Sequence, residues 1–337
     1  MNKKKLLVTG GCGFIGQNLV NGFVEAGFDV TVLDYNGKPF RDDVRFIQAD
    51  IRDKQAVIEA CEGMDTIIHN ASVVLTKQVL KQMVWDVNLG GTHHIIEACK
   101  IHRIPKMVYI SSASAVYEGK DIENGDEQLP YSSISQADYA DSKIQAEKAV
   151  LKFSGQFNTV VCAIRPHVVF GPEDNRFVPN IVERAKQGKL TRAVGDRDKL
   201  SDFTYIDNLV EATVAAEAAL KSDSKVAGEA YFITNGEPMA FFDFVSDFIV
   251  EIGHAPITKK VPFWLAYGVA AIVEGIDILK GGSLKENGMT RFAIKYMVTH
   301  HYYSIAKAKR DFGYEPKISL AEGIKLTVAD LKQKGVI

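Results

Sequence analysis

The feature that most constrains the fold of this chain is a glycine-rich turn, TGGCGFIG, at residues 9–16. It follows an apolar run, KLLVTG (5–10), and opens a stretch with helical periodicity, FIGQNLVNGFVEAG (14–27). Glycine permits a tight turn and lets backbone N–H groups at the start of a helix approach a pyrophosphate. The glycine spacing is a shifted relative of the GxGxxG loop, in its expected strand–turn–helix context. The residues expected to bind a dinucleotide here are Gly10, Gly13, Phe14, Ile15 and Gly16.

Strand-like and helical runs alternate through the first half of the chain. Further strands are expected at 29–35, 44–50, 66–71, 106–112 and 159–166, and further helices at 54–63, 87–102 and 136–153. Nearly continuous apolar strands that alternate with helices indicate a parallel sheet covered on both faces. The sequence therefore predicts an α/β protein with a Rossmann-type doubly wound sheet.

The regular alternation weakens after Pro166, although EAYFIT (229–234) has the composition of a last strand that returns to the sheet. We therefore expect two domains. The dinucleotide-binding domain is expected over 1–170, with 204–235 returning to it. A smaller, discontinuous substrate-binding lobe is expected from 171–203 and 236–337.

Composition excludes several classes of protein. With 40 Lys and Arg against 42 Asp and Glu, the net charge of −2 offers no basic field for nucleic acid. The four cysteines, Cys12, Cys61, Cys99 and Cys162, form no CxxC pair, so we expect buried thiols and no metal site. The apolar run LLV near the N-terminus is too short for a signal peptide core. We expect a cytoplasmic protein.

One segment complicates that expectation. Residues 262–280, PFWLAYGVAAIVEGIDILK, are strongly apolar, but Glu274 and Asp277 interrupt them. The run falls short of the roughly 20 apolar residues that span a bilayer. It is expected to form a buried helix or a wall over an apolar pocket. The alternative is a helix on a membrane surface, with at most weak lipid contact.

Asp34 stands at the end of the second predicted strand, 18 residues after Gly16. A carboxylate at this place accepts hydrogen bonds from the adenosine ribose and repels a 2′-phosphate. The next residues, Tyr35 and Asn36, are not basic, and Arg41 is a more distant phosphate partner. We expect NAD as cofactor rather than NADP.

The third predicted strand ends in QADIRD, which contains Asp50 and Ile51. Both are expected at the adenine end of the cofactor, where the Asp50 carboxylate accepts a hydrogen bond from the adenine amino group. The alternative for Asp50 is a loop or helix-capping acid.

A tyrosine and a lysine stand one helical turn apart in YADSK (139–143), on one face of a predicted helix. A free phenol has a pKa near 10, so only about 0.1% is ionised at pH 7. A neighbouring ammonium and the positive nicotinamide both lower that pKa. A lone YxxxK occurs by chance, but the glycine turn supplies a context. We expect Tyr139 to be the general acid/base and Lys143 to supply charge and contact the nicotinamide ribose.

A serine-rich turn, ISSASAVYEG (110–119), follows the fifth predicted strand. A hydroxyl donor there is expected to hold the substrate oxygen. Ser112 is the first choice because the strand end fixes its position, and Ser111 and Ser114 are alternatives.

Together these motifs resemble the extended short-chain dehydrogenase/reductase family, within the NAD-dependent epimerase/dehydratase superfamily. The segments that carry the resemblance span nearly the whole chain: the glycine turn, Asp34, HNAS (69–72), NLGGT (88–92), the serine turn, YADSK and RPHVVFGP (165–172). The resemblance implies that the Asn70–Ala71 backbone lies near the cofactor. It also implies that Asn88 supports the catalytic helix, and that Pro166 and His167 follow a strand that borders the nicotinamide.

Within that family, three segments look most like 3β-hydroxysteroid dehydrogenases and sterol 4α-carboxylate decarboxylating enzymes, a pattern that bacterial β-keto acid reductases share. They are residues 111–131, 165–190 and 195–212. The resemblance implies an NAD-dependent dehydrogenase that acts on a secondary alcohol or ketone of a bulky apolar substrate. It also implies a homodimer that pairs the helices at 87–102 and 136–153.

The alternative is a sugar-nucleotide epimerase or dehydratase with tightly held NAD. The serine turn argues against it, because AVYEG is one residue longer than the VYG that usually follows the serines in those enzymes, so that Ser112 or Ala113 faces the substrate. An epimerase also needs cations in the second lobe for a diphosphate. The available cations are Arg176, Arg184, Lys186, Lys189, Arg192 and Arg197.

Overall fold

Seven parallel strands form the central sheet of the chain, which we describe in a computed structural model. The structure describes residues 3–37, 40–74, 82–281 and 290–337. The sheet has the order β12-β7-β5-β4-β1-β2-β3, and each neighbouring pair is parallel. Its strands are β1 (Lys5–Thr9), β2 (Asp29–Asp34), β3 (Arg45–Gln48), β4 (Thr66–His69), β5 (Lys106–Ile110), β7 (Val160–Pro166) and β12 (Ala230–Ile233). The predicted doubly wound fold is confirmed, and the return strand expected at 229–234 is β12.

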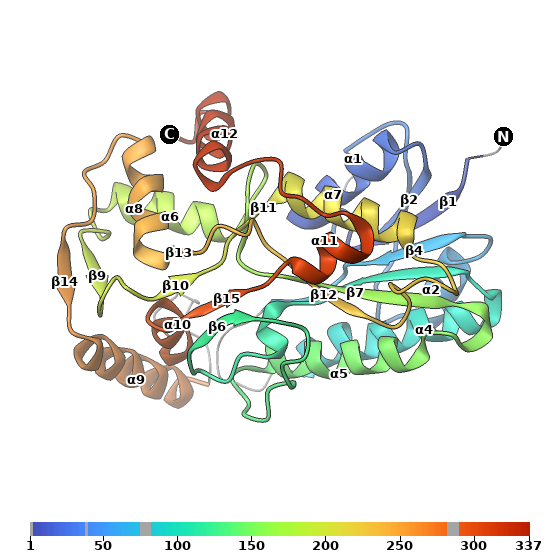
Figure 1. Cartoon of the computed structure of the whole chain (residues 1–337), viewed down its shortest axis with the longest axis horizontal. Coiled ribbons are helices and arrows are strands. Elements are labelled where there is room, and N and C mark those ends of the chain that lie inside the picture. The colour runs from blue at the N-terminus through green and yellow to red at the C-terminus, as the bar shows by residue number, and fades with distance from the viewer. Residues whose placement is uncertain (1–2, 38–39, 75–81, 282–289) are drawn as a thin grey trace.

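Helices cover both faces of this sheet (Figure 1). On one face lie α1 (Phe14–Glu25) and α7 (Ile206–Ala219), and on the other lie α2 (Lys54–Ala60), α4 (Gly91–His102) and α5 (Asp138–Phe153). Side chains of a strand alternate between the two faces. In β1, Leu6 and Val8 therefore join the core under α1 and α7, while Leu7 joins the core under α4.

The order of the strands reverses between β1 and β4. The chain winds from β1 outward through β2 to β3, and then returns to β4 on the opposite side of β1. In open α/β sheets, ligands bind in the crevice outside the carboxyl ends of the strands at such a reversal. The topology therefore places a binding site beside the turn at residues 9–16.

The remaining elements connect the sheet strands or build a second layer beyond their carboxyl ends. The helices are α3 (Gln82–Trp85), a π-helical turn (Asp86–Gly90), two 3₁₀ turns (Ala113–Ala115 and Gln156–Asn158), α6 (Phe177–Lys186), α8 (Phe241–Glu251), α9 (Phe263–Leu279), α10 (Arg291–Met297), α11 (Ala306–Phe312) and α12 (Leu320–Gln333). The strands are β6 (Ile122–Gly125), β8 (Val169–Phe170), β9 (Arg192–Val194), β10 (Leu200–Ser201), β11 (Thr204–Tyr205), β13 (Met239–Ala240), β14 (Lys259–Val261) and β15 (His301–Tyr303). The division into a domain of 1–170 with 204–235 and a lobe of 171–203 with 236–337 stays a prediction.

Stacked aromatic rings join segments of the second layer to one another. The rings of Phe203 and Phe244 stack with centroids 3.9 Å apart, and Phe170 packs edge-on against Phe244 at 4.9 Å. All three side chains are fully buried. Phe244 belongs to α8, Phe170 to β8, and Phe203 directly precedes β11. This packing therefore joins α8 to segments that are far from it in the sequence.

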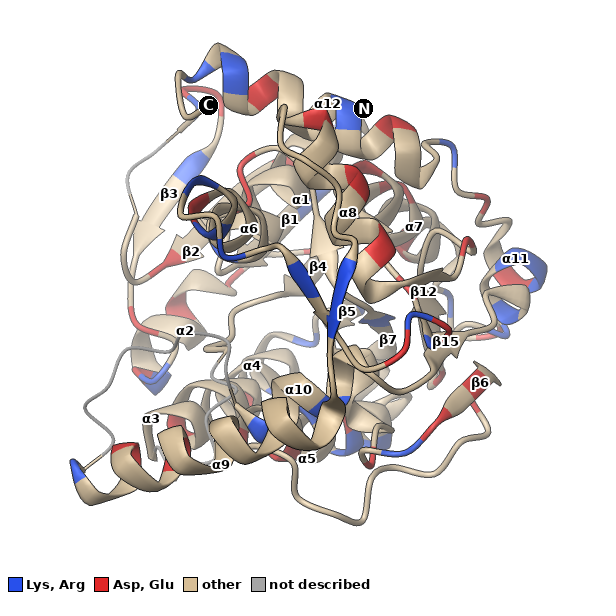
Figure 2. Ribbon diagram, turned by 90° about the vertical axis from the view of Figure 1, so that its left-hand side faces the viewer, with Lys and Arg blue, Asp and Glu red and all other residues tan. Residues whose placement is uncertain are grey.

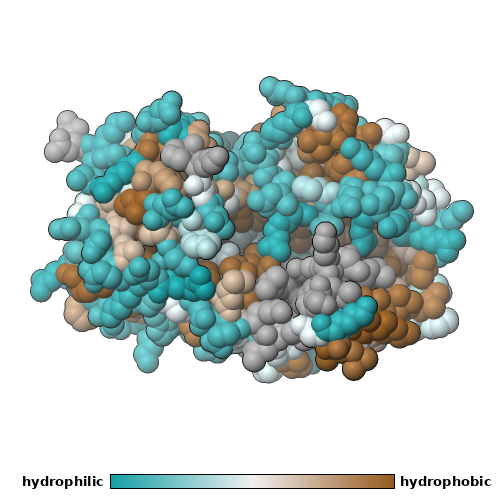
Figure 3. All heavy atoms as spheres, turned by 180° about the vertical axis from the view of Figure 1, so that it is seen from behind, coloured by the Kyte–Doolittle hydropathy of each residue, from teal (hydrophilic) through white to brown (hydrophobic). Residues whose placement is uncertain are grey.

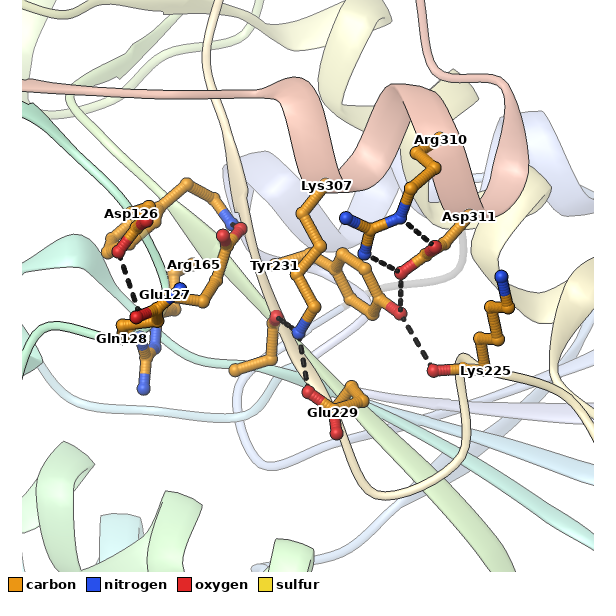
Figure 4. A network of polar contacts seen from close by, with 12 residues as sticks. Asp126, Glu127, Gln128, Arg165, Lys225, Glu229, Tyr231, Lys307, Arg310 and Asp311 are labelled. Carbon is orange, nitrogen blue, oxygen red and sulfur yellow. Dashed lines mark hydrogen bonds and ion pairs between the residues drawn. The ribbon is translucent and has the colours of Figure 1, made fainter.

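A polar network holds the last strand of the sheet against α11 (Figure 4). The Lys307 ammonium donates to the carbonyl of Ala230 at 2.9 Å and pairs with Glu229. The Tyr231 hydroxyl donates to the Asp311 carboxylate at 3.1 Å. These contacts fix β12 at the edge of the sheet, so the helix compensates for the missing neighbour of an edge strand.

The helix α9 is not buried, so the expectation of a buried helix at 262–280 is wrong. Trp264, Ile272 and Leu279 are 72%, 65% and 89% exposed. Figure 2 shows α9 as an almost uncharged ribbon, and Figure 3 shows a hydrophobic patch where α9 lies in the view from behind. Among the described residues, no helix combines the length and the apolar character needed to cross a membrane.

Candidate active site

A cavity of about 810 Å³ opens at the carboxyl ends of the sheet strands. Its volume falls in the range typical of cofactor and small-molecule sites. It brings together most of the residues expected at the site: Gly10, Gly13, Phe14, Ile15, Asp34, Asp50, Ile51, Asn70, Ala71, Ser112, Tyr139, Lys143 and Pro166. Gly16, Asn88 and His167 are not among the residues that line it.

The glycine turn is shaped by two close backbone approaches. Gly10 has φ +66°, and a Cβ there would lie 2.7 Å from the Ala71 Cα. A Cβ on Gly16 would lie 2.0 Å from the Gly10 carbonyl oxygen. Only glycine fits both positions. Gly16 thus supports the turn from behind, and the start of α1, which no side chain caps, is left facing the cavity.

The Asp34 carboxylate ends β2 at the rim of the cavity. It accepts hydrogen bonds from the backbone N–H groups of Cys12 at 2.9 Å and Asn36 at 3.1 Å. A carboxylate offers about four acceptor sites, so it can also accept from a ligand hydroxyl. Cys12 lines the cavity as well, while Cys61, Cys99 and Cys162 are buried, and none of the four cysteines forms a disulfide.

Asp50 lies at the same end of the cavity and is engaged by Arg52. The guanidinium donates to both carboxylate oxygens, and the Arg52 backbone N–H donates to one of them at 2.9 Å. This hydrogen bonding lowers the pKa of Asp50. The helix-capping role considered for Asp50 belongs instead to Asp53, which caps α2. Arg41, the distant phosphate candidate, pairs with Asp43 and does not line the cavity.

Tyr139 and Ser112 bring their hydroxyl groups together in the cavity. Tyr139 stands in the first turn of α5, and Ser112 follows β5. Burial raises the pKa of Tyr139, and the hydrogen bond with Ser112 and then the charge of Arg176 act in the opposite direction. The Ser112 oxygen also accepts from the Ser114 hydroxyl at 2.9 Å and the Ser114 backbone N–H at 3.2 Å. Of the three candidate serines, Ser111 and Ser112 line the cavity.

Lys143 is almost completely buried, with 2% of its surface exposed. Its ammonium donates to the Ile110 carbonyl at 2.7 Å and lies 4.9 Å from the centre of the Tyr109 ring. Burial lowers the pKa of Lys143 to about 7, while the charge of Glu147 raises it. In the chain by itself the pKa of Tyr139 is raised, so the expected lowering by Lys143 is not met. For both groups, desolvation by burial outweighs the stabilising groups nearby, which are Ser112 and Arg176 for Tyr139 and Glu147 for Lys143.

Asn88 acts from behind the cavity wall. Its amide donates to the Ser142 hydroxyl at 2.9 Å and to the Val73 carbonyl at 3.1 Å, and its oxygen accepts from the Val73 N–H at 2.7 Å. It lies in the π-helical turn at 86–90, a distortion common at functional sites. Asn88 therefore ties α5 to the loop after β4, whose residues Asn70 and Ala71 line the cavity.

His167 points away from the cavity. Its Nδ1 bonds to the Asp202 carbonyl at 2.6 Å, and its Nε2 lies 2.7 Å from the Tyr296 hydroxyl. Burial, and then the charge of His301, hold its pKa well below the ordinary value, so the ring is neutral at pH 7. Pro166, one residue earlier, does line the cavity.

Two further residues reach the cavity from the segment between β8 and α6: Arg176, named above only as a candidate cation for a diphosphate, and Asp174, which was not predicted as a site residue. The Asp174 carboxylate accepts from the backbone N–H groups of Arg176, Phe177 and Val178 at 2.8–3.1 Å. Burial raises the pKa of Asp174, and these hydrogen bonds partly offset that effect because they lower the pKa. The sequence signal for the turn was an acid shortly before a helical run, EDNRFVPNIV.

Comparison with known proteins gives the family. The model described as "3-beta hydroxysteroid dehydrogenase/isomerase family" matches residues 7–263. The chain is 34% identical over 327 residues to the sterol-4-alpha-carboxylate 3-dehydrogenase, decarboxylating, of Mus musculus, covering 96% of this chain and 90% of that protein. It is 37% identical over 335 residues to the 2-alkyl-3-oxoalkanoate reductase of Stenotrophomonas maltophilia, covering 95% of this chain and 97% of that protein.

Solved structures agree in fold at lower identity. An epimerase from Methanothermobacter thermautotrophicus has a TM-score of 0.78 at 21% identity, with 99% of this chain and 94% of that one covered. The UDP-glucuronic acid 4-epimerase of Bacillus cereus, solved with NAD, has a TM-score of 0.75 at 21% identity, covering 98% and 99%. At that identity the likeness shows the Rossmann-type fold alone. On the match of the family model and the two curated relatives, the chain belongs to the 3-beta hydroxysteroid dehydrogenase/isomerase family.

Proposed function

We propose that this protein is an NAD-dependent oxidoreductase that interconverts a secondary alcohol and a ketone. The observation that carries the proposal is the meeting of the Tyr139 and Ser112 hydroxyls in the cavity that also holds the glycine turn. The curated relatives are dehydrogenases and reductases by name. The glycine turn, where no Cβ fits at Gly10 or Gly16, and the Asp34 carboxylate suit the pyrophosphate and the adenosine ribose of a dinucleotide.

In this proposal the chain moves a proton while the cofactor supplies the hydride chemistry. Bound cofactor would supply the hydride chemistry: the oxidised form would take a hydride from the carbinol carbon, and the reduced form would give one to the ketone carbon. The Tyr139 hydroxyl gives a proton to the substrate oxygen in reduction and removes it in oxidation. The Ser112 hydroxyl holds that oxygen, and Asn88 keeps α5, with Tyr139 and Lys143, in place. The raised pKa of Tyr139 keeps the phenol protonated at neutral pH, which is the state that reduction needs.

For the substrate we propose a bulky apolar compound, either a 3β-hydroxysteroid or sterol or a long-chain β-keto acid. By their names, the two relatives reported above act on a sterol-4-alpha-carboxylate and on a 2-alkyl-3-oxoalkanoate. The cavity wall offers apolar surface from Val168, Val169 and Phe177. The contrasting class, sugar nucleotides, needs cations for a diphosphate. Of the six candidate cations, Arg176 alone is among the described residues that line the cavity.

The test is turnover with NAD of three panels of compounds: hydroxysteroids, β-hydroxy acids and UDP-sugars. Reduction of added NAD, followed by absorbance, with either of the first two panels supports the proposal. Interconversion of UDP-sugars without net NADH, by protein that retains NAD through purification, would instead identify an epimerase.

Replacing Asp34 with serine is expected to increase the use of NADP relative to NAD. The reason is that the carboxylate repels a 2′-phosphate, and its removal takes away that charge. We expect the ratio of kcat/KM for NADP to that for NAD to rise roughly 10-fold to 100-fold, since a hydrogen bond to a charged group contributes about 1.5–3 kcal/mol. Asp29→Ser, at the exposed far end of β2, is the matched control. A wild type that already prefers NADP would contradict the assignment of Asp34.

We further propose that α9 touches membrane surfaces. Its exposed apolar side chains lie between exposed lysines, Lys259 and Lys260 before it and Lys280 after it. The two acids that interrupt the apolar run are turned inward: Asp277 is buried, and Glu274 pairs with Arg291 of α10. The apolar face is therefore free of the charges that seemed to oppose lipid contact, and burial in lipid contributes about 25 cal/mol per Å².

Vesicle flotation measures this contact. We expect weak co-flotation with vesicles that contain anionic lipid, and its loss in the Trp264→Glu, Ile272→Glu double variant. Leu326→Glu, a 41% exposed position on α12, is the control. Firm, salt-resistant flotation would replace the expectation of a cytoplasmic protein with that of a membrane-bound one, and no flotation would remove the lipid role of α9.

We also propose a homodimer in which α4 and α5 pair with the same helices of a second copy. The two helices lie side by side on one face of the sheet (Figure 1). The outer side of α4 carries Ile101, which is 53% exposed. Sedimentation at micromolar concentration measures the mass, and a monomer there would reject the dimer.

A further inference from the structure

The helix that carries Tyr139 and Lys143 has a third ionisable side chain in the same column. Glu147 follows Lys143 at the spacing by which Lys143 follows Tyr139, so the three side chains lie on one face of α5. Glu147 is fully buried, and it is not among the described residues that line the cavity. It stands one turn beyond Lys143, and the mechanism proposed above gives it no role.

Arg165 of β7 holds the Glu147 carboxylate from the side of the sheet. Its Nε donates to both carboxylate oxygens at 3.1 Å, and its Nη2 donates to one of them at 2.5 Å. The guanidinium is 5.2 Å from the centre of the Phe232 ring and 5.4 Å from that of Tyr131. A contact between a planar guanidinium and both oxygens of a carboxylate fixes direction as well as charge. The pair therefore fastens α5 to β7 next to Lys143.

A buried ion pair is a costly way to fasten a helix. Both charges must be taken out of water, and apolar side chains of similar volume often stabilise a core as well or better. Arg165 is 3% exposed and Glu147 is not exposed at all, so neither charge is hydrated from the surface. Packing alone therefore does not explain why two charges occupy this place.

Lys143 is the neighbour that gains from the charge of Glu147. Its ammonium donates to the Ile110 carbonyl at 2.7 Å and lies 4.9 Å from the centre of the Tyr109 ring. Burial lowers the pKa of Lys143 to about 7, and the charge of Glu147 acts in the opposite direction. The lysine thus stands close to losing its proton at neutral pH, and the carboxylate one turn away favours the charged form.

The other ionisable groups around Lys143 and the pair do not replace Glu147. Burial keeps several of them neutral at pH 7, because it lowers the pKa of an imidazole and raises that of a phenol: His69 on β4, Tyr109 on β5, Tyr131 before α5, Tyr139 on α5 and Tyr303 on β15. Two further charged groups interact with neighbours of Lys143 instead. Glu127, drawn with Arg165 in Figure 4, interacts with Arg165, and the Lys148 ammonium lies 4.8 Å from the centre of the Tyr131 ring.

We propose that Glu147 and Arg165 are positioning residues for the proposed reaction: Glu147 keeps the buried Lys143 ammonium charged, and Arg165 keeps Glu147 in place one turn beyond it. Without Arg165 the buried carboxylate would be unpaired and would take up a proton rather than stay charged. The pair lies outside the cavity and acts on it through Lys143. The inference rests on the proposed oxidoreductase function, in which Lys143 contacts the nicotinamide ribose.

The test is the pH at which Lys143 loses its proton, followed by NMR of isotope-labelled lysine in the chain without cofactor. The signal to follow is the one that disappears in Lys143→Met. We expect a midpoint of about 7 in the wild type. In Glu147→Gln it should fall by roughly 1–3 pH units, the usual effect of losing an opposite charge at this range. Arg165 is then an unpaired buried cation, which lowers the midpoint further.

The double variant Glu147→Gln, Arg165→Met removes both charges and leaves none unpaired. Its midpoint should lie between those of the wild type and Glu147→Gln, an order that a purely mechanical role of the pair does not produce. Glu251→Gln, exposed at the end of α8, is the matched control and should titrate like the wild type. An unchanged midpoint in Glu147→Gln would overturn the proposal. If the single variant does not fold, a double variant that titrates like the wild type would overturn it equally.

NADH binding, followed by fluorescence titration, connects the titration of Lys143 to the proposed function. The charged lysine binds the ribose more strongly, so the affinity for NADH should fall as the pH rises through the midpoint. In Glu147→Gln this fall should occur at lower pH. The same pH dependence in Glu147→Gln and the wild type would contradict the proposal. Absence of turnover for every compound in the panels would refute the oxidoreductase function, and the NMR titration would still decide whether Glu147 keeps Lys143 charged.

Discussion

Tyr139→Phe is expected to lower kcat by roughly 10²-fold to 10⁴-fold, the usual contribution of a positioned acid or base. The variant removes one oxygen atom and keeps the ring in the first turn of α5, where Tyr139 is partly buried. The loss should appear equally in kcat and kcat/KM, because the proton is transferred only in the transition state. Steady-state kinetics with NAD and an active secondary alcohol measure it.

The control for Tyr139→Phe is the affinity for NADH, which should stay within a few-fold. Because burial raises the pKa of the phenol, the wild-type rate of oxidation should rise with pH on the alkaline side of neutrality, where the base form increases. Tyr139→Phe should lose that rise. A variant with the wild-type rate would refute the acid/base role. Tyr131→Phe, on the loop before α5, is the matched substitution outside the cavity.

Lys143→Met is expected to lower both the rate and the affinity for NADH, each by about 10-fold or more. A charged contact to the nicotinamide ribose and a charge beside the phenol are both lost, and hydrogen bonds to charged groups contribute about 1.5–3 kcal/mol. Fluorescence titration of NADH measures the first loss and kcat the second. The matched control is Lys152→Met, an exposed lysine in the last turn of the same helix.

The same substitution should change how stability depends on pH. The pKa of Lys143 falls to about 7 in the folded chain, below its unfolded value near 10.4, so the unfolded chain binds more protons between pH 7 and 10. This difference makes the free energy of unfolding of the wild type rise with pH across that window. Lys143→Met should flatten the rise, as chemical denaturation at several pH values would show. In the NADH titration described above, an unchanged affinity of Lys143→Met would contradict the contact of Lys143 with the nicotinamide ribose.

The fold and the centre of the site could be predicted from the sequence because their signals come from residues close together in the chain. A hydrophobic period or a characteristic residue type, both visible within a short window of sequence, marks each of three segments: the apolar run at 5–10, the turn at 9–16 and the helix after it. The strands expected around β1, β2, β4, β5 and β7 all appear, with ends shifted by a few residues. Tyr139 and Lys143 lie in one helix, so their spacing alone predicts that they share a face.

The exposure of α9 was decided by tertiary structure. Composition shows that α9 is apolar but not what covers it, and the prediction of a buried helix was wrong for that reason. The chain packs α9 through Ala266 and Ala270 and leaves the large side chains outside. The inward turn of Glu274 depends on Arg291, which belongs to a different helix.

The directions of individual side chains also came from packing rather than from sequence. His167 follows β7 as expected, yet it bonds to Asp202 and Tyr296 and leaves the cavity to Pro166. The Lys143 ammonium donates to the Ile110 carbonyl inside the protein, and burial rather than the attraction of Glu147 governs its pKa. Arg176 is one of six cations in its segment, and only the fold selects it for the cavity wall. Sequence alone determined which elements form and which of the expected residue types line the cavity, because those depend on local periodicity and spacing. Tertiary structure decided which face of each element is covered and which charge enters the site, because these depend on segments far apart in the chain.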